Sequence, residues 1–537
     1  MKRCAALAAV ALLLLAACSK QGAGGPTNAP GVLRIAGYAE PTSLNPLLGT
    51  NTAENFLSSL AFDLLVTLDE KGNDVPDLAA TVPTLANHGI STDGRTITYH
   101  LRHGVKWQDG APFTSADVKF SWQAVMNPNN NVVERRGYDQ VASVDTPDAY
   151  TIVFHLKQPF SPFVDTVFGE SDDPFRIVPK HLLAQYANIN RIPFNQQPIG
   201  TGPFRVVRWY HGDHVEYAAN PHYFRGAPKV QRLLVYSVAD DNTRMAELRS
   251  HGVDLLLDIS AAAYHSLHTA AGVRTLLAKA PSYTSIVFNL VHPPLNDVRI
   301  RRAIAYAIDE QRVVRDVTYG AGTVAIADLS DFYWAFDPAI RPYSYNPALA
   351  GQLLDQAGWR RDSSGMRAKG GRRLSLQLAY GSGNATARSI GVEVQSQLRQ
   401  AGIDVPIKTY TYSMLYATQQ LGGILQSGKF DLAEYAWISG ADPDDSSQWL
   451  CTMSPPAGNN IGHYCDRTLD AQEQIALTQF DRATRKRAYS RIESLLVSDA
   501  PAAFQYYVPR RYAMNPSLRN FSPNGVSEGW NANQWSL

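Results

Sequence analysis

The sequence predicts a large α/β protein with at least two lobes. Segments typical of strands alternate along the chain with segments typical of helices, and no internal repeat is visible. The chain has 537 residues, and even without the leader at residues 1–17 it is longer than one hydrophobic core usually supports. One segment, at residues 98–122, joins a strand, a tight turn and a capped helix in a single run.

This segment reads TYHLRHGVKWQDGAPFTSADVKFSW. Its strand, at residues 96–101, alternates between apolar and polar side chains as a half-buried strand does. Asp109-Gly110 supplies a turn. Thr114 with Asp117 then forms a capping-box-like start for the helix. Segments of this kind are usually scaffold, so we expect this one to identify the fold and to touch no ligand.

The first 17 residues are typical of a secretory leader. Two basic residues precede the apolar run at residues 5–17, which is too short to span a bilayer stably. The sequence LAAC at residues 15–18 resembles a bacterial lipobox, which predicts cleavage before Cys18 and a lipid on its thiol; a plain signal peptide with a chance cysteine is the alternative. Residues 18–31 are typical of a flexible tether. We therefore expect an extracytoplasmic protein held to a bacterial membrane by its lipid alone.

Composition excludes several classes of function. The net charge is +1, and charged residues make up 18% of the chain against roughly 25% in ordinary domains. Binding to nucleic acid would normally require a basic face, so we expect no nucleic-acid partner. No second apolar run approaches membrane-spanning length, so a role in transport would need a separate membrane permease. We expect the protein to be a monomer.

Two of the four cysteines are left to pair with each other. Cys4 leaves with the leader and Cys18 is the lipidation candidate, so Cys451 and Cys465 remain in an oxidising compartment. We expect a disulfide between them. A zinc site with His463 as a third ligand is the alternative, although the fourteen-residue spacing lacks the short pitch usual for zinc cysteines.

Several segments together resemble the extracytoplasmic solute-binding proteins of peptide-type ABC importers, family 5. They are residues 98–122, GTGPF at residues 200–204, an Asn-Pro-x-Tyr end at residues 220–223, and a helix opened by NDVR at residues 296–299. Matches of this kind run from residue 32 to about residue 508. Their combined order is far more specific than any single segment.

The resemblance implies a periplasmic-binding-protein (Venus-flytrap) fold of the large peptide-binding class, with mixed sheets. The chain would cross between the lobes twice, and residues 285–289 and 503–507 are the two short apolar strands that suit those crossings. We therefore expect one lobe at residues 32–284 plus 508–537 and the other at residues 285–507. A ligand would lie in the cleft and be buried when the lobes close.

The stretch YAWISGADPDD at residues 435–445 is where this sequence departs from the family. In peptide binders of the family, a tryptophan is followed shortly by an aspartate that pairs with the peptide ammonium group. Trp437 matches the tryptophan, but Gly440 stands where the aspartate would fall. We expect Trp437 to offer an apolar cleft wall. Asp442 either replaces the missing carboxylate or makes a turn with Pro443.

The family topology implies further cleft residues, each of which could equally be packing or surface. They follow the first strand, flank the crossings or form an aromatic cluster at residues 332–334: Tyr38, Glu40, Tyr283, Asn289, Tyr506 and Trp334. As a group they would suit a pocket with aromatic walls and adaptable polar groups.

The function that we predict is capture of an extended, peptide-like solute and its delivery to an ABC permease with its ATPase subunits. An oligosaccharide, an opine-like compound or a metal chelate is the alternative ligand. An extracytoplasmic hydrolase or a chaperone-like protein is the alternative from another class. The chain has no G-x-S-x-G elbow and no H-E-x-x-H helix, and we expect no enzyme activity, no cofactor and no metal site.

Overall fold

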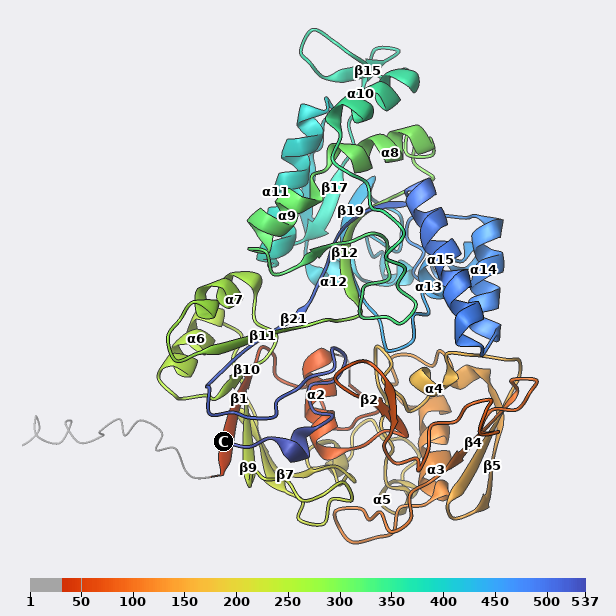
Figure 1. Ribbon diagram of the computed structural model, residues 1–537, viewed down its shortest axis with the longest axis vertical. Coiled ribbons are helices and arrows are strands. Elements are labelled where there is room, and N and C mark those ends of the chain that lie inside the picture. The colour runs from red at the N-terminus through yellow and green to blue at the C-terminus, as the bar shows by residue number, and fades with distance from the viewer. Residues whose placement is uncertain (1–30, 50) are drawn as a thin grey trace, which may run out of the picture.

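The computed structural model describes residues 31–49 and 51–537, so the predicted leader, Cys18 and residues 18–30 of the predicted tether lie outside the described residues. Two large sheets, one of seven strands and one of six, form the centres of two lobes. Figure 1 shows the first lobe, in red to yellow-green with the dark blue C-terminal segment, below the second, in green to blue. We call them lobe I and lobe II. No helix in the described part of the chain is long and apolar enough to cross a membrane.

The sheet of lobe I is mixed. Its central strand is buried along almost its whole length and pairs in parallel with both of its neighbours, while the outer pairings are antiparallel. The strands, in spatial order, are β11 (Arg274–Ala278), β21 (Arg510–Met514), β10 (Leu255–Leu256), β1 (Val32–Gly37), β9 (Arg232–Ser237), β8 (His214–Ala219) and β7 (Phe204–Tyr210).

A smaller antiparallel sheet of lobe I carries the segment that the sequence analysis singled out. Its order is β4 (Thr96–His100), β6 (Thr151–Leu156) and β5 (Val141–Asp148). Helix α3 (Ser115–Met126) follows β4, and the predicted capping box is confirmed because the Asp117 carboxylate accepts the Thr114 backbone N–H at 2.9 Å. The segment shares one hydrophobic core with β1. It lines neither of the two cavities described below, one between the lobes and a smaller one in lobe I.

The other elements of lobe I cover these sheets. They are α2 (Thr52–Ala61), β2 (Val66–Leu68), β3 (Asp74–Pro76), η1 (Tyr138–Gln140), α4 (Phe163–Thr166), α5 (Lys180–Leu183), η2 (Pro193–Asn195), α6 (Asp241–Arg249), α7 (Ala261–His268) and η5 (Ala532–Gln534).

The sheet of lobe II has two fully buried strands side by side, β20 and β12. The strands, in spatial order, are β13 (Thr323–Val324), β20 (Ala502–Tyr507), β12 (Ser282–Phe288), β19 (Leu432–Ile438), β17 (Leu378–Gly381) and β18 (Ile407–Tyr410). The short strands β14 (Arg360–Arg361), β15 (Arg367–Lys369) and β16 (Arg372–Arg373) form a separate sheet.

Helices cover both faces of that sheet, as Figure 1 shows. They are α8 (Val298–Ala307), α9 (Glu310–Val317), α10 (Pro347–Gln356), α11 (Ala385–Gln400), α12 (Tyr412–Leu415), η3 (Gln419–Leu421), α13 (Ser446–Trp449), η4 (Cys451–Met453), α14 (Arg467–Thr478) and α15 (Arg482–Asp499). The predicted start of α8 is confirmed, because Asp297 caps the helix by accepting the Arg299 N–H at 2.9 Å.

The chain passes between the two sheets at residues 279–281, from β11 to β12, and at residues 508–509, from β20 to β21. The segments predicted as crossings therefore belong to the lobe II sheet, and the connections lie just before the first of them and just after the second. Strand β12 pairs with β19 along all seven of its residues, beginning at Ser282. We accordingly propose residues 282–507 as lobe II and, among the described residues, those before 279 and after 509 as lobe I.

The predicted disulfide between Cys451 and Cys465 is confirmed. It closes a loop in lobe II, so these two cysteines are not available as zinc ligands. The loop lies between α13 and α14, the elements that follow the YAWISGADPDD stretch.

Three carboxyl groups are buried together in the core of lobe II. Asp445 is within hydrogen-bond reach of both Asp328 and Glu473, and Trp449 donates its Nε1–H to Asp328 at 2.6 Å. Burial and the charges of neighbouring carboxyls raise the pKa of Asp445 and of Glu473 well above the ordinary range. A hydrogen bond between two carboxyls needs a proton, so this cluster favours the protonated forms.

The pKa shifts of this cluster predict a pH-dependent stability. A carboxyl whose pKa is raised by folding contributes most below its unfolded pKa of about 4, and that contribution is lost as the pH rises towards the folded pKa. Glu473→Gln should match the wild type near pH 4 and be more stable at pH 8, by roughly 1 to 3 kcal/mol. Denaturant unfolding at both pH values measures this, with exposed Glu70→Gln as the control. Parallel pH profiles for wild type and Glu473→Gln would contradict it.

Candidate functional site

The two lobes touch through hydrogen bonds to backbone carbonyls outside the connecting segments. Ser161 of lobe I donates its N–H to the Leu477 carbonyl at 2.7 Å and its hydroxyl to the Ala476 carbonyl at 2.6 Å. Ala441 of lobe II donates its N–H to the Glu170 carbonyl at 2.7 Å. Such bonds form only when the lobes approach each other, so the structure is a closed state.

An ion pair adds to this closed contact. The guanidinium of Arg136 in lobe I lies 3.5 Å from the Asp444 carboxylate in lobe II. The Asp444 side chain is only 7% exposed. Burial alone would lower the pKa of Arg136, but the carboxylates of Asp444 and Asp172 outweigh that effect and raise it. Arg136 therefore stays charged and couples the two lobes electrostatically.

Gly440 lies at a close approach between the main chains of the two lobes. A Cβ atom at this position would lie 2.6 Å from the Ser171 Cα and 2.7 Å from the Asp172 backbone nitrogen. Atoms at that distance overlap, so no side chain fits here in the closed state. The main chain of lobe I occupies the space that a side chain at position 440 would need.

Asp442 is buried and already paired. Both of its carboxylate oxygens accept from Nη2 of Arg485, at 2.7 and 2.8 Å, and one also accepts the Asp444 N–H at 3.0 Å. Burial raises the pKa of Asp442, and the Arg485 guanidinium opposes that shift. The turn and the ion pair thus account for this carboxylate without a ligand.

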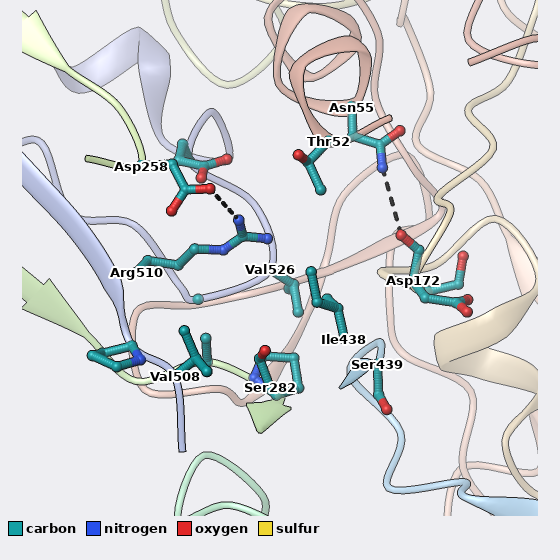
Figure 2. Close-up of a pocket in the computed structure, with 16 residues that line it drawn as sticks. Thr52, Asn55, Asp172, Asp258, Ser282, Ile438, Ser439, Val508, Arg510 and Val526 are labelled. Atoms are coloured by element: carbon teal, nitrogen blue, oxygen red, sulfur yellow. Dashed lines mark hydrogen bonds and ion pairs between the residues drawn. The ribbon is translucent and has the colours of Figure 1, made fainter. Parts of the chain in front are cut away.

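A cavity of about 100 Å³ lies between the lobes at their two connections. Figure 2 shows helix α2 at one side of it, Arg510 with Asp258 at a second, Asp172 at a third, and Ser282, Ile438 and Ser439 of lobe II opposite α2. Its full lining is Thr52, Asn55, Ser171, Asp172, Asp258, Ala280, Pro281, Ser282, Ile438, Ser439, Val508, Pro509, Arg510, Gly525, Val526 and Glu528. We call it the hinge cavity.

The charged groups of the hinge cavity are three carboxyls and one guanidinium. Nη1 of Arg510 lies 3.2 Å from the Asp258 carboxylate. Burial would lower the pKa of Arg510, but Asp258 and Glu528 raise it. Burial raises the pKa of Glu528, which Arg510 opposes. Arg510 therefore faces two carboxyls, whereas Asp172 lines the cavity on another side.

A smaller, mostly apolar cavity of about 30 Å³ lies in lobe I and shares Thr52, Asp258, Arg510 and Glu528 with the hinge cavity. Its other walls include Tyr38, Phe56, Leu57 and Val235. The two cavities are therefore neighbours, and both are lined by the Arg510–Asp258 ion pair.

The comparisons with known proteins identify the family. The model of the bacterial extracellular solute-binding proteins, family 5, matches residues 75–459, more than half of the chain. The chain belongs to this family. Protein XP55 of Streptomyces lividans is 32% identical over 494 residues, which cover 91% of this chain and 86% of that protein.

Solved structures confirm the two-lobed fold of the family 5 protein. NikZ from Campylobacter jejuni in complex with Ni(L-His) is 28% identical, with a TM-score of 0.79, and the match covers 95% of this chain and all of that one. The oligopeptide-binding protein AppA from Bacillus subtilis in complex with a nonapeptide is 26% identical, with a TM-score of 0.76, covering 95% of this chain and 99% of that one.

Two of the predicted cleft residues lie at or beside the cavities of this family 5 protein. Tyr38 lines the lobe I cavity and its hydroxyl is bonded to that of Thr52. Trp437 directly precedes two residues that line the hinge cavity, but its own ring packs on the other face of β19, against Tyr435. Its Nε1–H donates to the Ser439 hydroxyl at 2.7 Å, so Trp437 fixes a cavity residue.

The other predicted cleft residues lie elsewhere. Tyr283 and Tyr506 are buried in lobe II, where the Tyr283 hydroxyl donates to Gln448. Asn289 is fully buried and donates to the carbonyls of Gly428 and Phe430. The structure gives these three side chains packing roles in lobe II.

Glu40 and Trp334 also lie away from the hinge cavity. Glu40 accepts the Gly212 N–H on lobe I. Trp334 lines a separate interlobe cavity of about 390 Å³, together with Arg482 and Arg485. No residue of either interlobe connection lines that cavity. In the described ranges, 31–49 and 51–537, no group of three His, Cys, Asp or Glu side chains could hold a metal ion.

Sequence reasoning missed Arg510, Asp258, Glu528 and Asp172. Arg510 could have been found, since it comes three residues after the end of the second crossing strand. Asp258 lies in a loop with positive φ, and Glu528 belongs to the C-terminal segment that returns to lobe I. Neither of these two has a local sequence signal, and only the fold brings them to Arg510.

The Gly440 contact predicts that even one methyl group opposes closure. Gly440→Ala should shift the equilibrium between closed and open states roughly tenfold towards the open state, because overpacking of this kind costs about 1 to 3 kcal/mol. Energy transfer between one fluorophore on each lobe, with solute bound, measures that shift.

Gly381→Ala is the matched control, since a Cβ there meets only Leu415 at an ordinary 3.6 Å. Equal energy transfer in Gly440→Ala and in the control would show that the lobes do not close through this contact.

Proposed function

We propose that this family 5 protein captures a short, peptide-like solute in the hinge cavity and delivers it unchanged to an ABC permease with its ATPase subunits. The observation that carries the proposal is the hinge cavity itself, enclosed by residues of both lobes and of both connections. Closure of such lobes buries a solute, and the closed form is a shape that a permease could recognise. The AppA complex with a nonapeptide, at 26% identity, supports a peptide-like ligand.

The size of the cavity argues for a small solute. Sites that bury a drug-sized ligand usually measure about 300 to 1,000 Å³. The hinge cavity has about 100 Å³. In this closed state it fits a group about as large as the end of a peptide and no extended chain.

A non-peptide solute is the second candidate. The NikZ complex with Ni(L-His), at 28% identity, supports a compact ligand of that kind. The polar lining of the hinge cavity, with hydroxyl groups from Thr52, Ser282 and Ser439, would serve either class. We also propose that Cys18 carries a lipid that holds the protein at a membrane surface; this anchor rests on the sequence alone.

Mass spectrometry of solutes released from the purified, gently denatured protein tests the proposed function. We expect a single class of small solute, which rebinds to the stripped protein and is recovered chemically unchanged. Recovery of no solute, together with no binding in titration calorimetry, would contradict the proposal. Chemical conversion of the solute during incubation with the protein would show that the protein is an enzyme.

A further inference from the structure

We propose that the far end of lobe II is a docking surface for an anionic lipid bilayer, whose phosphate groups its arginines bind. The surface consists of the three-stranded sheet β14–β15–β16, at residues 360–373, and of Arg399 in the neighbouring helix α11. We call it the lobe II tip. Figure 1 shows β15 at the end of lobe II that lies farthest from lobe I. The inference goes beyond the proposed function, because this surface lines neither the hinge cavity nor the cavity beside Trp334.

The charge of the lobe II tip differs from that of the whole chain. The chain is nearly balanced, with 49 basic and 48 acidic residues. The sheet at residues 360–373 holds one acid, Asp362, and six basic residues: Arg360, Arg361, Arg367, Lys369, Arg372 and Arg373. All of these basic residues except Arg367 are exposed, and so is Arg399. A surface with this excess of positive charge attracts anions.

One buried arginine fixes this sheet to the body of lobe II. The side chain of Arg367 is only 3% exposed, its Nη1 lies 2.7 Å from the Asp355 carboxylate, and its Nε–H donates to the Ala401 carbonyl at 2.9 Å. Arg361 donates to the Gln400 carbonyl at 2.7 Å, which holds the sheet beside the end of α11. The lobe II tip is therefore a preformed platform, so docking would order little of its backbone.

The acid of the sheet does not neutralise the exposed cations. One carboxylate oxygen of Asp362 is engaged in its own turn, where it accepts the Ser364 N–H at 2.8 Å and the Met366 N–H at 3.2 Å. Its other oxygen lies 3.9 Å from Arg373. In the described ranges, 31–49 and 51–537, three guanidiniums of the lobe II tip have no ion pair and no side-chain hydrogen bond: Arg360, Arg372 and Arg399. These three can bind anions from outside the protein.

An open cavity of about 370 Å³ lies in the lobe II tip. Its lining is Arg361, Ser364, Gly365, Met366, Arg373 and Arg399. Guanidinium groups form paired hydrogen bonds with phosphate oxygens, so three of them around one cavity suit a phosphate-bearing headgroup. Three further cations of the same sheet lie outside the cavity: Arg360, Lys369 and Arg372. This spread of charge favours a surface that carries many phosphate groups over a single phosphate ion.

The shape of the lobe II tip suits a bilayer. A Cβ atom at Gly365, Gly370 or Gly371 would meet no atom within 4 Å, so the space around both turns of the sheet is open. A bilayer can therefore approach the exposed cations without meeting the rest of lobe II. The lipid that we propose on Cys18 would keep the protein near such a surface. Since the chain enters lobe I at β1, a second contact at the lobe II tip would lay the molecule along the bilayer.

Energy transfer from a fluorophore on Ser363→Cys to an acceptor lipid measures this docking, because residue 363 lies in the turn between β14 and β15. The full chain is titrated with vesicles of phosphatidylcholine, either alone or with about 30% phosphatidylglycerol. Any attachment through the amino-terminal segment is common to both kinds of vesicle. We expect transfer on the anionic vesicles only. That transfer should be lost at about 1 M salt, where the Debye length falls to about 3 Å.

Removal of the three unpaired guanidiniums tests which surface docks. Arg360→Gln, Arg372→Gln and Arg399→Gln together should raise the lipid concentration for half-maximal transfer roughly tenfold to a hundredfold. The matched control removes three exposed charges from lobe I and so changes the net charge equally: Arg191→Gln, Arg205→Gln and Lys229→Gln. The control should dock like the wild type. The melting temperature shows whether each variant is folded.

Equal transfer on anionic and neutral vesicles would overturn the inference, and so would equal docking of the tip variant and the lobe I control. If the tip variant does not fold, the wild type decides the case, because transfer that salt does not weaken would contradict docking through charge. Transfer that millimolar inorganic phosphate abolishes at constant ionic strength would assign the cavity to free phosphate and overturn the bilayer as its occupant. None of these results bears on the hinge cavity, so the proposed function is tested separately by its released solute.

Discussion

The backbone contact at Gly440 is the constraint on which the arrangement of the cleft depends. The main chain of lobe I at Ser171 and Asp172 fills the place of a side chain at this position. The neighbouring Ala441 N–H can then reach the Glu170 carbonyl, and Asp444 can reach Arg136. A carboxylate at position 440 would face a ligand. In this chain, Gly440 contacts the main chain of lobe I instead.

The distribution of charge follows from that contact. Arg485, Arg136 and Arg510 each face carboxylates of the protein, so the cations near the cleft are already used. The hinge cavity itself is lined by three carboxyls and one guanidinium. Removing partly buried carboxylates from water without a partner is costly. A closed cleft of this composition is therefore better suited to a cation than to an anion.

Much of the fold could be predicted because its signals are local. The capping box at Thr114, the cap of α8 at Asp297 and the Cys451–Cys465 pair each depend on residues close in the sequence. The cleft was harder to predict. Asp442 is paired with Arg485, which lies 43 positions further on in helix α15, and no local pattern reports that partner.

The crossing strands show a second limit of sequence reasoning. Their apolar and aromatic residues suggested cleft walls, yet Tyr283 and Tyr506 pack in lobe II because helices and loops cover both faces of its sheet. A tyrosine that lines a cleft and one that closes a core have the same local sequence. The connections that do line the cavity are short Pro-containing segments, at residues 279–281 and 508–509, which have no apolar periodicity to detect.

A crystal structure of the protein with its copurified solute is the most direct measurement of this account. The account predicts the solute in the hinge cavity, enclosed by residues of both lobes, with Gly440 against Ser171. A solute that pairs with Asp442 after displacing Arg485, or one that lies in the cavity beside Trp334, would contradict it.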